Sequence, residues 1–550
     1  MNRFLVQFLV IFLSFFTLVS CESSDIFIRI SQVGFLADDI KSGVVISKIR
    51  LDDKKFEIID LKSKKSVLNG KLEKFDFTHN NFEFAYRFDF TELTKPGTYT
   101  ISVQKAKSIP FNVGGEQFAP IVDTLMLFYK IQRCGYTNPE WHEVCHIADA
   151  TSLIFNGRTL DKQVDVTGGW HDAADYIKFF NTTAYTTYLL LFSYEFDSEK
   201  FGFDNDKNGA PDILEEAKIG LDWLIRADYR DKKFITQVQD LRDHEVGWRM
   251  PENDPLAFDR PGFTGIGKNL VGLYAATMAS AARIWKTKFN DDDFSTECLN
   301  RAIQKYSIIN EVDDIDSSGT GMYLDNKWEG KAALGAIELY NTTGEAKYLN
   351  DAELYGELAK SDYWWSWGNI NSLAHFKIAK YKSDYVNYIK NNLIHFNNTM
   401  NKNLFGEGAA FSWGTNNTLM GIALQAILYK SLTGEATFDS LQVYQRDYIL
   451  GKNQWGLSFI HGIGQKYTQN FHHQIAHFMN GHLPGGFAAG PVTKEFLDAY
   501  NIPFDKGDEY LLFQSDSSFY RDDKMDYISN EPTITANATA IFVMGYYSKR

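Results

Sequence analysis

The sequence is short of cysteine, proline and positive charge. Its 550 residues include four cysteines and 12 prolines, and 70 acidic side chains outnumber 56 Lys and Arg, which gives a formal net charge of −14. So little proline excludes long proline-rich linkers. The acidic balance argues against a nucleic-acid partner, because phosphate binding requires a basic surface. Hydrophobic residues make up 44% of the chain and aromatic residues 15%. We therefore expect a globular protein whose surplus of Trp and Tyr suits stacking on flat apolar faces.

Long apolar runs are also missing, except at the N-terminus. Arg3 precedes an apolar run at 4–20 that ends in small residues, which predicts a secretory signal over residues 1–20. The run is short for a membrane-spanning helix. Its end resembles a bacterial lipobox, which implies cleavage before Cys21 and lipidation of that thiol. An ordinary signal peptide with an incidental cysteine is the alternative. A lipid on Cys21 would anchor an exported protein in the periplasm or at the cell surface without spanning the membrane.

Residues 21–115 carry the pattern of short β-strands. Alternating apolar runs predict the strands, and turn residues such as Asn69-Gly70 and Pro96-Gly97 separate several of them. The predicted strands lie near 27–30, 44–46, 56–59, 82–86, 99–103 and 109–113. About 90 residues of short strands predict a small β-sandwich of the immunoglobulin type.

Between residues 116 and 550 the apolar residues recur with the period of a helix. The spacing predicts helices near 117–130, 184–194, 213–224, 271–285, 296–310, 329–340, 346–359, 372–380, 384–396, 417–432, 437–449 and 534–547. About a dozen helices suit either a toroid of six helical hairpins or an α-solenoid. The predicted fold class is therefore mainly α, with a small β domain in front.

Two carboxylates stand three residues apart in a loop rich in glycine and aromatic residues. Asp172 and Asp175 are separated by two alanines within the segment 168–176. Small residues between them let both carboxylates reach one small volume, where such a pair can hold and deprotonate a water molecule. Acidic loops with a purely structural role are common, so this segment alone does not decide a function.

A further carboxyl group, Glu531, precedes the last predicted helix. A glutamate in this position is most often a helix cap or a surface charge. Cleavage of a glycosidic bond, however, needs a carboxyl group besides the base, kept protonated so that it can donate to the leaving oxygen. A neighbouring aromatic side chain helps to raise the pKa of such a group.

Together these segments resemble the signature regions of glycoside hydrolase family 9. The segments that carry the resemblance are 168–176, 211–218, 243–252, 450–453, 470–478 and 530–538. The β-rich front part, which opens with residues 31–35, resembles the immunoglobulin-like domain that precedes many bacterial members. The resemblance spans nearly the whole mature chain in the family's order.

The resemblance implies an (α/α)6 barrel over residues 116–550 and hydrolysis with inversion at the anomeric carbon. Transferred residue by residue, it makes Asp175 the general base and Glu531 the general acid, while Asp172 helps to position the attacking water. His473 and Tyr527 match positions that line the sugar-binding cleft. Inversion requires ~6.5–9.5 Å between the acid and the base, which leaves room for the water.

The sequence departs from the family pattern at two places. Ala174 stands where the family often has glycine, and alanine forbids some backbone conformations. Gln474 stands where the family commonly has an arginine that donates a fork of hydrogen bonds to the substrate. Glutamine cannot replace that charge or geometry. The second departure leaves the acid and base alone but puts the subsite preference in doubt.

Cys134, Cys145, His146 and His171 form a candidate zinc site. Thiolate and imidazole are good zinc ligands, and four protein ligands make a closed structural site. Family members with this pattern bind zinc at the matching positions, where the metal would pin the neighbouring acidic loop. A disulfide between the two cysteines is the alternative, since it would be natural in an exported protein.

A second candidate metal site lies at residues 204–215. Its oxygen-bearing side chains have the spacing of a calcium loop, with glycine at the sixth position; they are Asp204, Asp206, Asn208, Asp212 and Glu215. The alternative is a turn rich in Asp and Asn that caps the following helix.

We expect an exported, lipid-anchored, monomeric glycoside hydrolase that cleaves β-1,4 bonds of a cellulose-like or related β-glucan, in the first place as an endoglucanase. The alternative is an exo-acting enzyme of the same family on cello-oligosaccharides, glucosamine oligomers or decorated glucans; the departure at Gln474 motivates it. A non-catalytic sugar-binding lipoprotein is the third hypothesis, and the presence of all three acid and base carboxyl groups argues against it.

Overall fold

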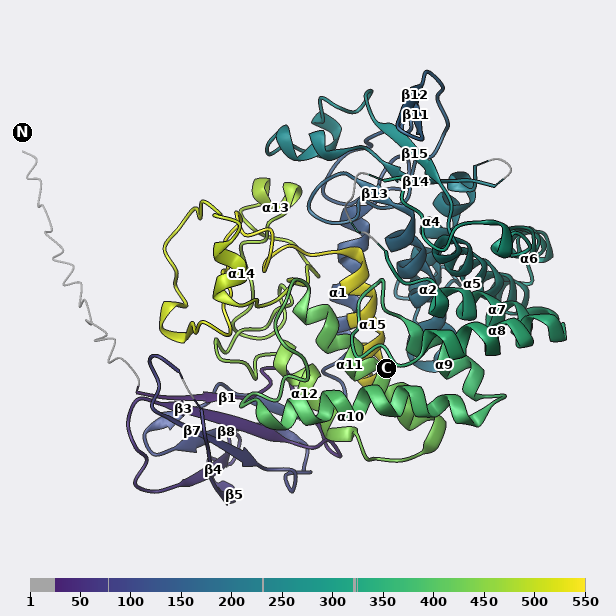
Figure 1. Ribbon diagram of the computed structural model, residues 1–550. Coiled ribbons are helices and arrows are strands. Elements are labelled where there is room, and N and C mark those ends of the chain that lie inside the picture. Colours follow the sequence, from purple (N-terminus) through teal and green to yellow (C-terminus); the bar gives the residue numbers. More distant parts are fainter. Residues whose placement is uncertain (1–24, 78, 230–231, 320–322, 324, 550) are drawn as a thin grey trace, which may run out of the picture.

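The computed structural model describes residues 25–77, 79–229, 232–319, 323 and 325–549 (Figure 1). The predicted signal at 1–20 and Cys21 lie outside the described residues. Among the helices of the described part, none is long and apolar enough to cross a membrane.

The strands are β1 (Ile26–Arg29), β2 (Gly34–Leu36), β3 (Ser42–Ser47), β4 (Lys55–Asp60), β5 (Ser66–Lys71), β6 (Glu73–Phe75), β7 (Phe84–Asp89), β8 (Gly97–Val103), β9 (Ala106–Lys107), β10 (Phe111–Gly114), β11 (Ser152–Phe155), β12 (Arg158–Leu160), β13 (Lys178–Phe179), β14 (Phe234–Val238) and β15 (Pro261–Gly265). The helices are α1 (Ala119–Gln132), α2 (Phe180–Phe196), α3 (Ser198–Phe201), α4 (Asp212–Ala227), α5 (Lys268–Ile284), α6 (Asp292–Tyr306), α7 (Glu329–Thr343), α8 (Ala346–Ala359), α9 (Asn371–Ala379), α10 (Val386–Lys402), α11 (Thr415–Thr433), α12 (Asp439–Ile449), α13 (Gln474–Phe478), α14 (Lys494–Asp498) and α15 (Ile534–Tyr547).

The first ten strands form the predicted β-sandwich. One sheet has the order β1-β3-β7-β6, and the other has the order β2-β10-β8-β4-β5 with β9 beside β8. Side chains of both sheets, such as Val45 and Phe88 from one and Ile101 from the other, meet in a core of their own. The expected turn at Asn69-Gly70 is wrong, because both residues lie inside β5. Gly70 is needed there for another reason: a Cβ on it would lie 2.3 Å from the Phe56 ring.

The rest of the chain forms the predicted (α/α)6 barrel. In the described part, twelve helices have nine or more residues. Six of them form an inner ring in which each packs against the next, in the order α2, α5, α7, α9, α11 and α15; α15 then packs against α2 and closes the ring. The outer helices are α1, α4, α6, α8, α10 and α12. Closure of the ring confirms the toroid and excludes the solenoid.

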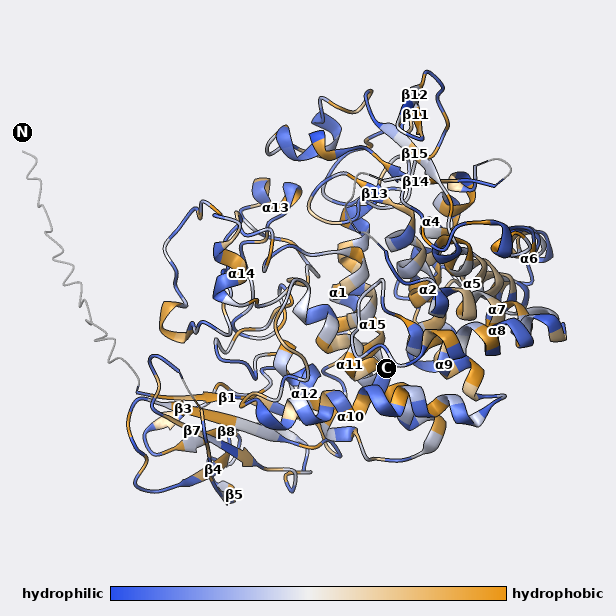
Figure 2. Cartoon of the chain, viewed as in Figure 1, coloured by the Kyte–Doolittle hydropathy of each residue, from blue (hydrophilic) through white to orange (hydrophobic). Residues whose placement is uncertain are grey.

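Burial differs between the two rings as the barrel requires. All residues from Phe180 to Ser193 of the inner helix α2 are buried, and α15 is buried almost throughout. The outer helix α10 buries one stripe of side chains, and in Figure 2 it is blue along much of its length with orange patches. The inner helices α2 and α15 therefore bury side chains on every face, while an outer helix such as α10 keeps a polar face toward water.

A five-stranded sheet stands at one end of the barrel, where we expected only helices and loops (Figure 1). Its strand order is β12-β11-β15-β14-β13. The strands are short, and β11 pairs in parallel with β15, more than a hundred residues away. Strand β14 is buried on both faces and lacks alternation, so neither period nor spacing indicated it.

The sandwich docks firmly on the barrel through Gln32. Its Nε2 donates to the carbonyls of Gly456 (3.0 Å) and Lys466 (2.8 Å), and its Oε1 accepts from the N–H groups of Gln465 and Lys466, both at 2.9 Å. The N–H of Gln32 also donates to Leu450 O (2.8 Å). Two segments that carry the family resemblance, 31–35 and 450–453, therefore meet at this interface.

Candidate active site

The loop before α2 presents Asp172 inside the mouth of the barrel. Its side chain is 1% exposed, and one of its carboxylate oxygens accepts a hydrogen bond from the Thr182 hydroxyl in the first turn of α2. Burial raises the pKa of Asp172 to about 7, although its hydrogen-bonding neighbours Thr182 and Tyr323 oppose this rise. A buried carboxyl in this setting can hold a water molecule without being a strong base itself.

Asp175, three residues later, is held from two sides. Its Oδ1 accepts from the N–H of Ile177 (3.0 Å), and its Oδ2 lies 2.8 Å from Nε2 of His244. His244 belongs to the short 3-10 helix Leu241–Glu245. The hydrogen bond to Asp175 raises the pKa of His244 to about 9. At neutral pH His244 is therefore an imidazolium that donates a hydrogen bond to Asp175.

Glu531 joins the same loop from the C-terminal part of the chain. Its Oε1 accepts a hydrogen bond from the N–H of Ala174 (3.2 Å), which lies between the two aspartates. Burial, followed by the negative charge of Asp175, raises the pKa of Glu531 to about 8. The structure thus brings together the three predicted carboxyl groups and keeps Glu531 protonated at neutral pH.

A row of aromatic side chains runs beside these carboxyl groups. Trp248 lies against His472 with ring centroids 5.1 Å apart, and His472 lies 5.8 Å from Tyr527. Tyr527 in turn contacts Trp413 and Tyr500, which are 43% and 42% exposed. Partly exposed aromatic rings beside a carboxyl cluster suit stacking on flat ligand faces. Tyr527, a predicted cleft residue, lies within this aromatic row.

His473 does not line the cleft as we predicted. Its side chain is 1% exposed, and its Nε2 lies 2.8 Å from Oε1 of Gln132. Its Nδ1 accepts from the N–H groups of Ile475 and Ala476 and so caps helix α13. Both of its ring nitrogens are occupied by protein, whereas the adjacent, half-buried His472 contacts Trp248 and Tyr527.

Gln132 shows what the buried His473 does instead. The side-chain amide of Gln132 donates to the carbonyls of His171 (3.1 Å) and Ala173 (2.6 Å). The hydrogen bonds that run from His473 through Gln132 therefore support the backbone of the acidic loop.

The four predicted zinc ligands come together in a buried cluster. Their ligand atoms lie at 3.8 Å (Cys134 Sγ to Cys145 Sγ), 3.7 Å (Cys134 Sγ to His146 Nδ1), 3.9 Å (Cys145 Sγ to His171 Nε2) and 3.1 Å (His146 Nδ1 to His171 Nε2). Such spacings are close to the edges of a tetrahedron around zinc at ~2.0–2.3 Å. Both cysteines are free, and their sulfur atoms are far beyond the ~2.05 Å of a disulfide.

The surroundings of the cluster also suit a metal. Burial lowers the pKa of His171 to about 4, so this imidazole is neutral and able to coordinate. Nε2 of His146 lies 3.0 Å from Asp254, the usual outer partner of a metal-binding histidine. Arg249 connects Asp254 to Asp243, whose carboxylate accepts from the N–H of Tyr176. The cluster and the acidic loop therefore form one network.

The predicted calcium loop gathers its acidic groups on the surface. Oxygens of Asp204, Asp206 and Asp212 lie within 4.8 Å of one another. Asn208 donates its side-chain amide to Asp206 (3.1 Å) and Glu215 (2.6 Å). Hydrogen bonds of this kind also fit the alternative of a polar turn before α4.

Sequence analysis missed Thr182 and Tyr323, and it assigned no role to His244. Tyr323 lies close to Asp172, Asp175 and Glu531, whose negative charges contribute to the rise of its pKa. A single Tyr or Thr in a long sequence carries no local signal of this kind. His244 lay within a segment that carried the resemblance, and only its distance to Asp175 reveals its role.

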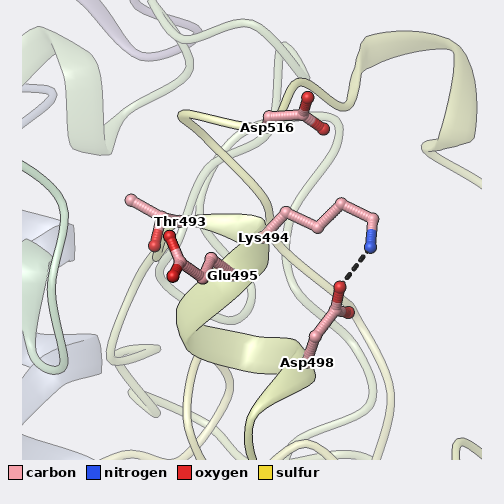
Figure 3. Close-up of a pocket in the computed structure, with 5 residues that line it drawn as sticks. All are labelled: Thr493, Lys494, Glu495, Asp498 and Asp516. Carbon is pink, nitrogen blue, oxygen red and sulfur yellow. Dashed lines mark hydrogen bonds and ion pairs between the residues drawn. The ribbon is translucent and has the colours of Figure 1, made fainter.

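A surface hollow lies away from these carboxyl groups. Figure 3 shows it on α14, where Lys494 pairs with Asp498 one turn later. Its lining residues are Thr493, Lys494, Glu495, Asp498 and Asp516. None of the predicted site residues lines this hollow, so the geometry of the carboxyl groups, and not the size of the hollow, identifies the candidate active site.

Comparison with known families agrees with this geometry. The model of glycosyl hydrolase family 9 matches residues 118–544. The chain belongs to glycosyl hydrolase family 9. The model of a cellulase N-terminal ig-like domain matches residues 24–108, which contain most of the β-sandwich.

Among curated relatives, a cellodextrinase from Butyrivibrio fibrisolvens is 24% identical over 81% of this chain and 86% of its own. A xyloglucan-specific endo-beta-1,4-glucanase from Bacteroides ovatus is 23% identical over 94% of this chain and 92% of its own. A solved metagenome-derived family 9 endoglucanase superposes with a TM-score of 0.79 at 25% identity, covering 95% of this chain and 99% of its own. A Zn-binding triple mutant of the family 9 endoglucanase J30 has a TM-score of 0.79 at 23% identity, and the match covers 94% of this chain and 99% of that protein's chain.

Proposed function

We propose that this protein hydrolyses β-1,4-glucosidic bonds in a β-glucan with inversion of configuration, in the first place as an endoglucanase. The observation that carries the proposal is the hydrogen bond from the N–H of Ala174 to Glu531. It holds a protonated carboxyl group against the loop that bears Asp172 and Asp175. A protonated carboxyl group beside a second carboxyl group that can act as the base is the arrangement that an inverting glycosidase needs.

In the proposed reaction Asp175, aided by Asp172, orients a water molecule and accepts its proton. The water oxygen attacks the anomeric carbon, and the bond from that carbon to the glycosidic oxygen breaks on the opposite face. Glu531 donates its proton to the departing oxygen. His244 holds Asp175 through its Oδ2 (2.8 Å) and keeps the carboxylate in one orientation. The aromatic row, with Tyr527 in it, supplies faces for the sugar rings.

The four-ligand cluster would hold a structural zinc ion. The ligands of such an ion would be Cys134, Cys145, His146 and His171, and the metal would supply rigidity and not hydrolytic chemistry, because a closed four-ligand site leaves no open position for substrate. His171 adjoins Asp172, so the cluster would fix the start of the acidic loop.

The proposal leaves two modes of cleavage to be distinguished, internal cleavage by an endoglucanase and release of small sugars from chain ends. The relatives include proteins named as endoglucanases and one named as a cellodextrinase, and the departure at Gln474 motivates the exo-acting alternative. Viscosity loss measured against new reducing ends on soluble β-glucan, xyloglucan and chitosan oligomers separates them. A steep fall in viscosity with few new ends supports the endoglucanase, whereas steady release of small sugars at constant viscosity supports the exo-acting alternative.

A sugar-binding protein without activity would show calorimetric binding and no new reducing ends. That result would reject the hydrolase proposal altogether.

Export and lipid anchoring belong to the proposal as well. The segment 1–20 and Cys21 suggest a lipoprotein on sequence grounds. Radiolabelled palmitate incorporation that disappears in a Cys21→Ser variant would support the anchor, and an unlabelled wild-type protein would reject it.

For the loop at 204–215 we propose a bound calcium ion. A calcium-dependent rise of the Tm that is lost in Asp204→Asn supports it, and an equal Tm with calcium and with a chelator rejects it.

A further inference from the structure

The short helix α13 is bound to the segment that carries Trp248. Gln474 is the first residue of α13, and its Oε1 accepts from the N–H of Arg249 (2.8 Å) while its Nε2 donates to the carbonyl of Gly247 (3.4 Å). The two hydrogen bonds lie on either side of Trp248. The side chain of Gln474 is nearly buried, since only 9% of the residue is exposed.

The same helix also holds the ring of Trp248. His477, one turn after Gln474, stacks on the indole with centroids 4.7 Å apart and an interplanar angle of 6°. The N–H of Gln474 donates to the carbonyl of Ala174 (3.3 Å) in the acidic loop. Helix α13 is therefore a bridge between the aromatic row and the carboxyl groups.

The segment 244–249, which contains Trp248, is bound to acidic residues at both ends. His244 at one end contacts Asp175 (2.8 Å). Arg249 at the other end is bound to Asp243 (2.5 Å) and Asp254 (2.8 Å). Gln474 binds the backbone of Gly247 and Arg249 at this end. Trp248 lies between these two residues, and its side chain joins the aromatic row.

We propose that Gln474 is a positioning residue that acts on substrate through Trp248. The side-chain amide of Gln474 forms its hydrogen bonds with the protein backbone. The sugar would therefore contact the indole ring of Trp248, which Gln474 holds in place, and not the side chain of Gln474 itself. This inference rests on the proposed function, because it assigns a role within the cleft of a glucan hydrolase.

A side chain with both a donor and an acceptor at its tip is required for this role. Methionine has a similar length but makes neither hydrogen bond, glutamate keeps the acceptor and loses the donor, and arginine offers donors only. The three variants therefore remove the contacts to Arg249 and Gly247 in different combinations.

The test is a double-mutant cycle on cellopentaose hydrolysis with Gln474→Met, Trp248→Ala and the pair together. Loss of two hydrogen bonds is expected to raise KM about tenfold in Gln474→Met, with kcat changed less than about threefold. In the Trp248→Ala background the same change should have almost no further effect on KM, because the residue acts through that ring. Gln474→Glu should fall between wild type and Gln474→Met, and Gln474→Arg should lose affinity. Gln304→Met, an exposed position on α6, is the matched control.

Several results would overturn the inference. Additive effects on KM would mean that Gln474 contacts substrate directly, an unchanged KM would mean that it has no such role, and tighter binding by Gln474→Arg would contradict the positioning role. Should Gln474→Met fail to fold by its Tm, the comparison of Gln474→Glu with wild type, alone and in the Trp248→Ala background, decides the question. If wild type releases no new reducing ends, the proposed function fails instead, and calorimetric binding of cellopentaose to the same variants then tests the positioning role.

Discussion

At the scale of single residues, the site keeps one carboxyl group protonated at neutral pH and holds a second one, Asp175, by a hydrogen bond close by. The protein achieves this by burying Glu531 beside negative charge, which raises its pKa to about 8, while His244 donates a hydrogen bond to Asp175. The surroundings of Glu531 therefore make this carboxyl group suitable as the acid.

Replacement of Glu531 by glutamine tests the acid. We expect kcat on unactivated cello-oligosaccharides to fall about 10³-fold with KM almost unchanged, because the leaving oxygen then receives no proton. An aryl cellobioside with a good leaving group should be much less affected, since it needs no protonation. Near-normal activity of Glu531→Gln on natural oligosaccharides would show that another group is the acid.

The pH dependence follows from the same residue. Glu531 donates its proton only while it is protonated, so kcat/KM should fall as the pH rises through about 8. The decline should approach tenfold per pH unit above that value. A profile measured with cellopentaose that stays flat to pH 10 would contradict this assignment.

At the scale of structural elements, local motifs were predictable and long-range partners were not. Asp172, Asp175 and the candidate zinc ligand His171 lie in one loop, so their spacing along the chain was enough to indicate a shared site. The five-stranded sheet escaped prediction because β11 and β15 pair over a long separation. His473 was assigned to the cleft because adjacent histidines look alike in sequence, and only the cap of α13 shows which of the two is buried.

The metal cluster gives a prediction at this scale. Purified protein should contain about one zinc ion per chain by atomic emission, and Cys134→Ser should lose it, because a closed site needs all four ligands. Removal of zinc should lower the Tm by about 5 °C or more and reduce activity through the acidic loop. Cys298→Ser is the control, since this cysteine is buried in α6 outside the cluster and should retain the metal. An unchanged zinc content in Cys134→Ser would rule out these ligands.

At the scale of the whole molecule, the closed ring of inner helices and the docked sandwich form the frame that positions the site. The toroid itself was one of two architectures allowed by helix periodicity, and closure between α15 and α2 is a contact that periodicity cannot reveal. The docking of the sandwich was not predicted either, because Gln32 contacts residues more than 400 positions away.

Gln32→Ala should weaken that docking. The change removes four side-chain hydrogen bonds to the barrel and leaves part-buried backbone groups without these partners, so we expect a loss of about 2–4 kcal/mol of unfolding free energy. Urea denaturation measured by circular dichroism provides the comparison with wild type, and the exposed Gln304→Ala serves as the control. A stability equal to that of the control would mean that the interface does not depend on Gln32.

The most direct test of the central claim is proton NMR of the sugars released from cellopentaose in the first minutes of reaction. A protonated Glu531 opposite a water held by Asp175 and Asp172 predicts that the new reducing ends appear first as the α-anomer and then mutarotate. Initial appearance of the β-anomer would contradict the single-displacement mechanism, and no new anomeric signal at all would contradict the assignment of this site as a glucan hydrolase.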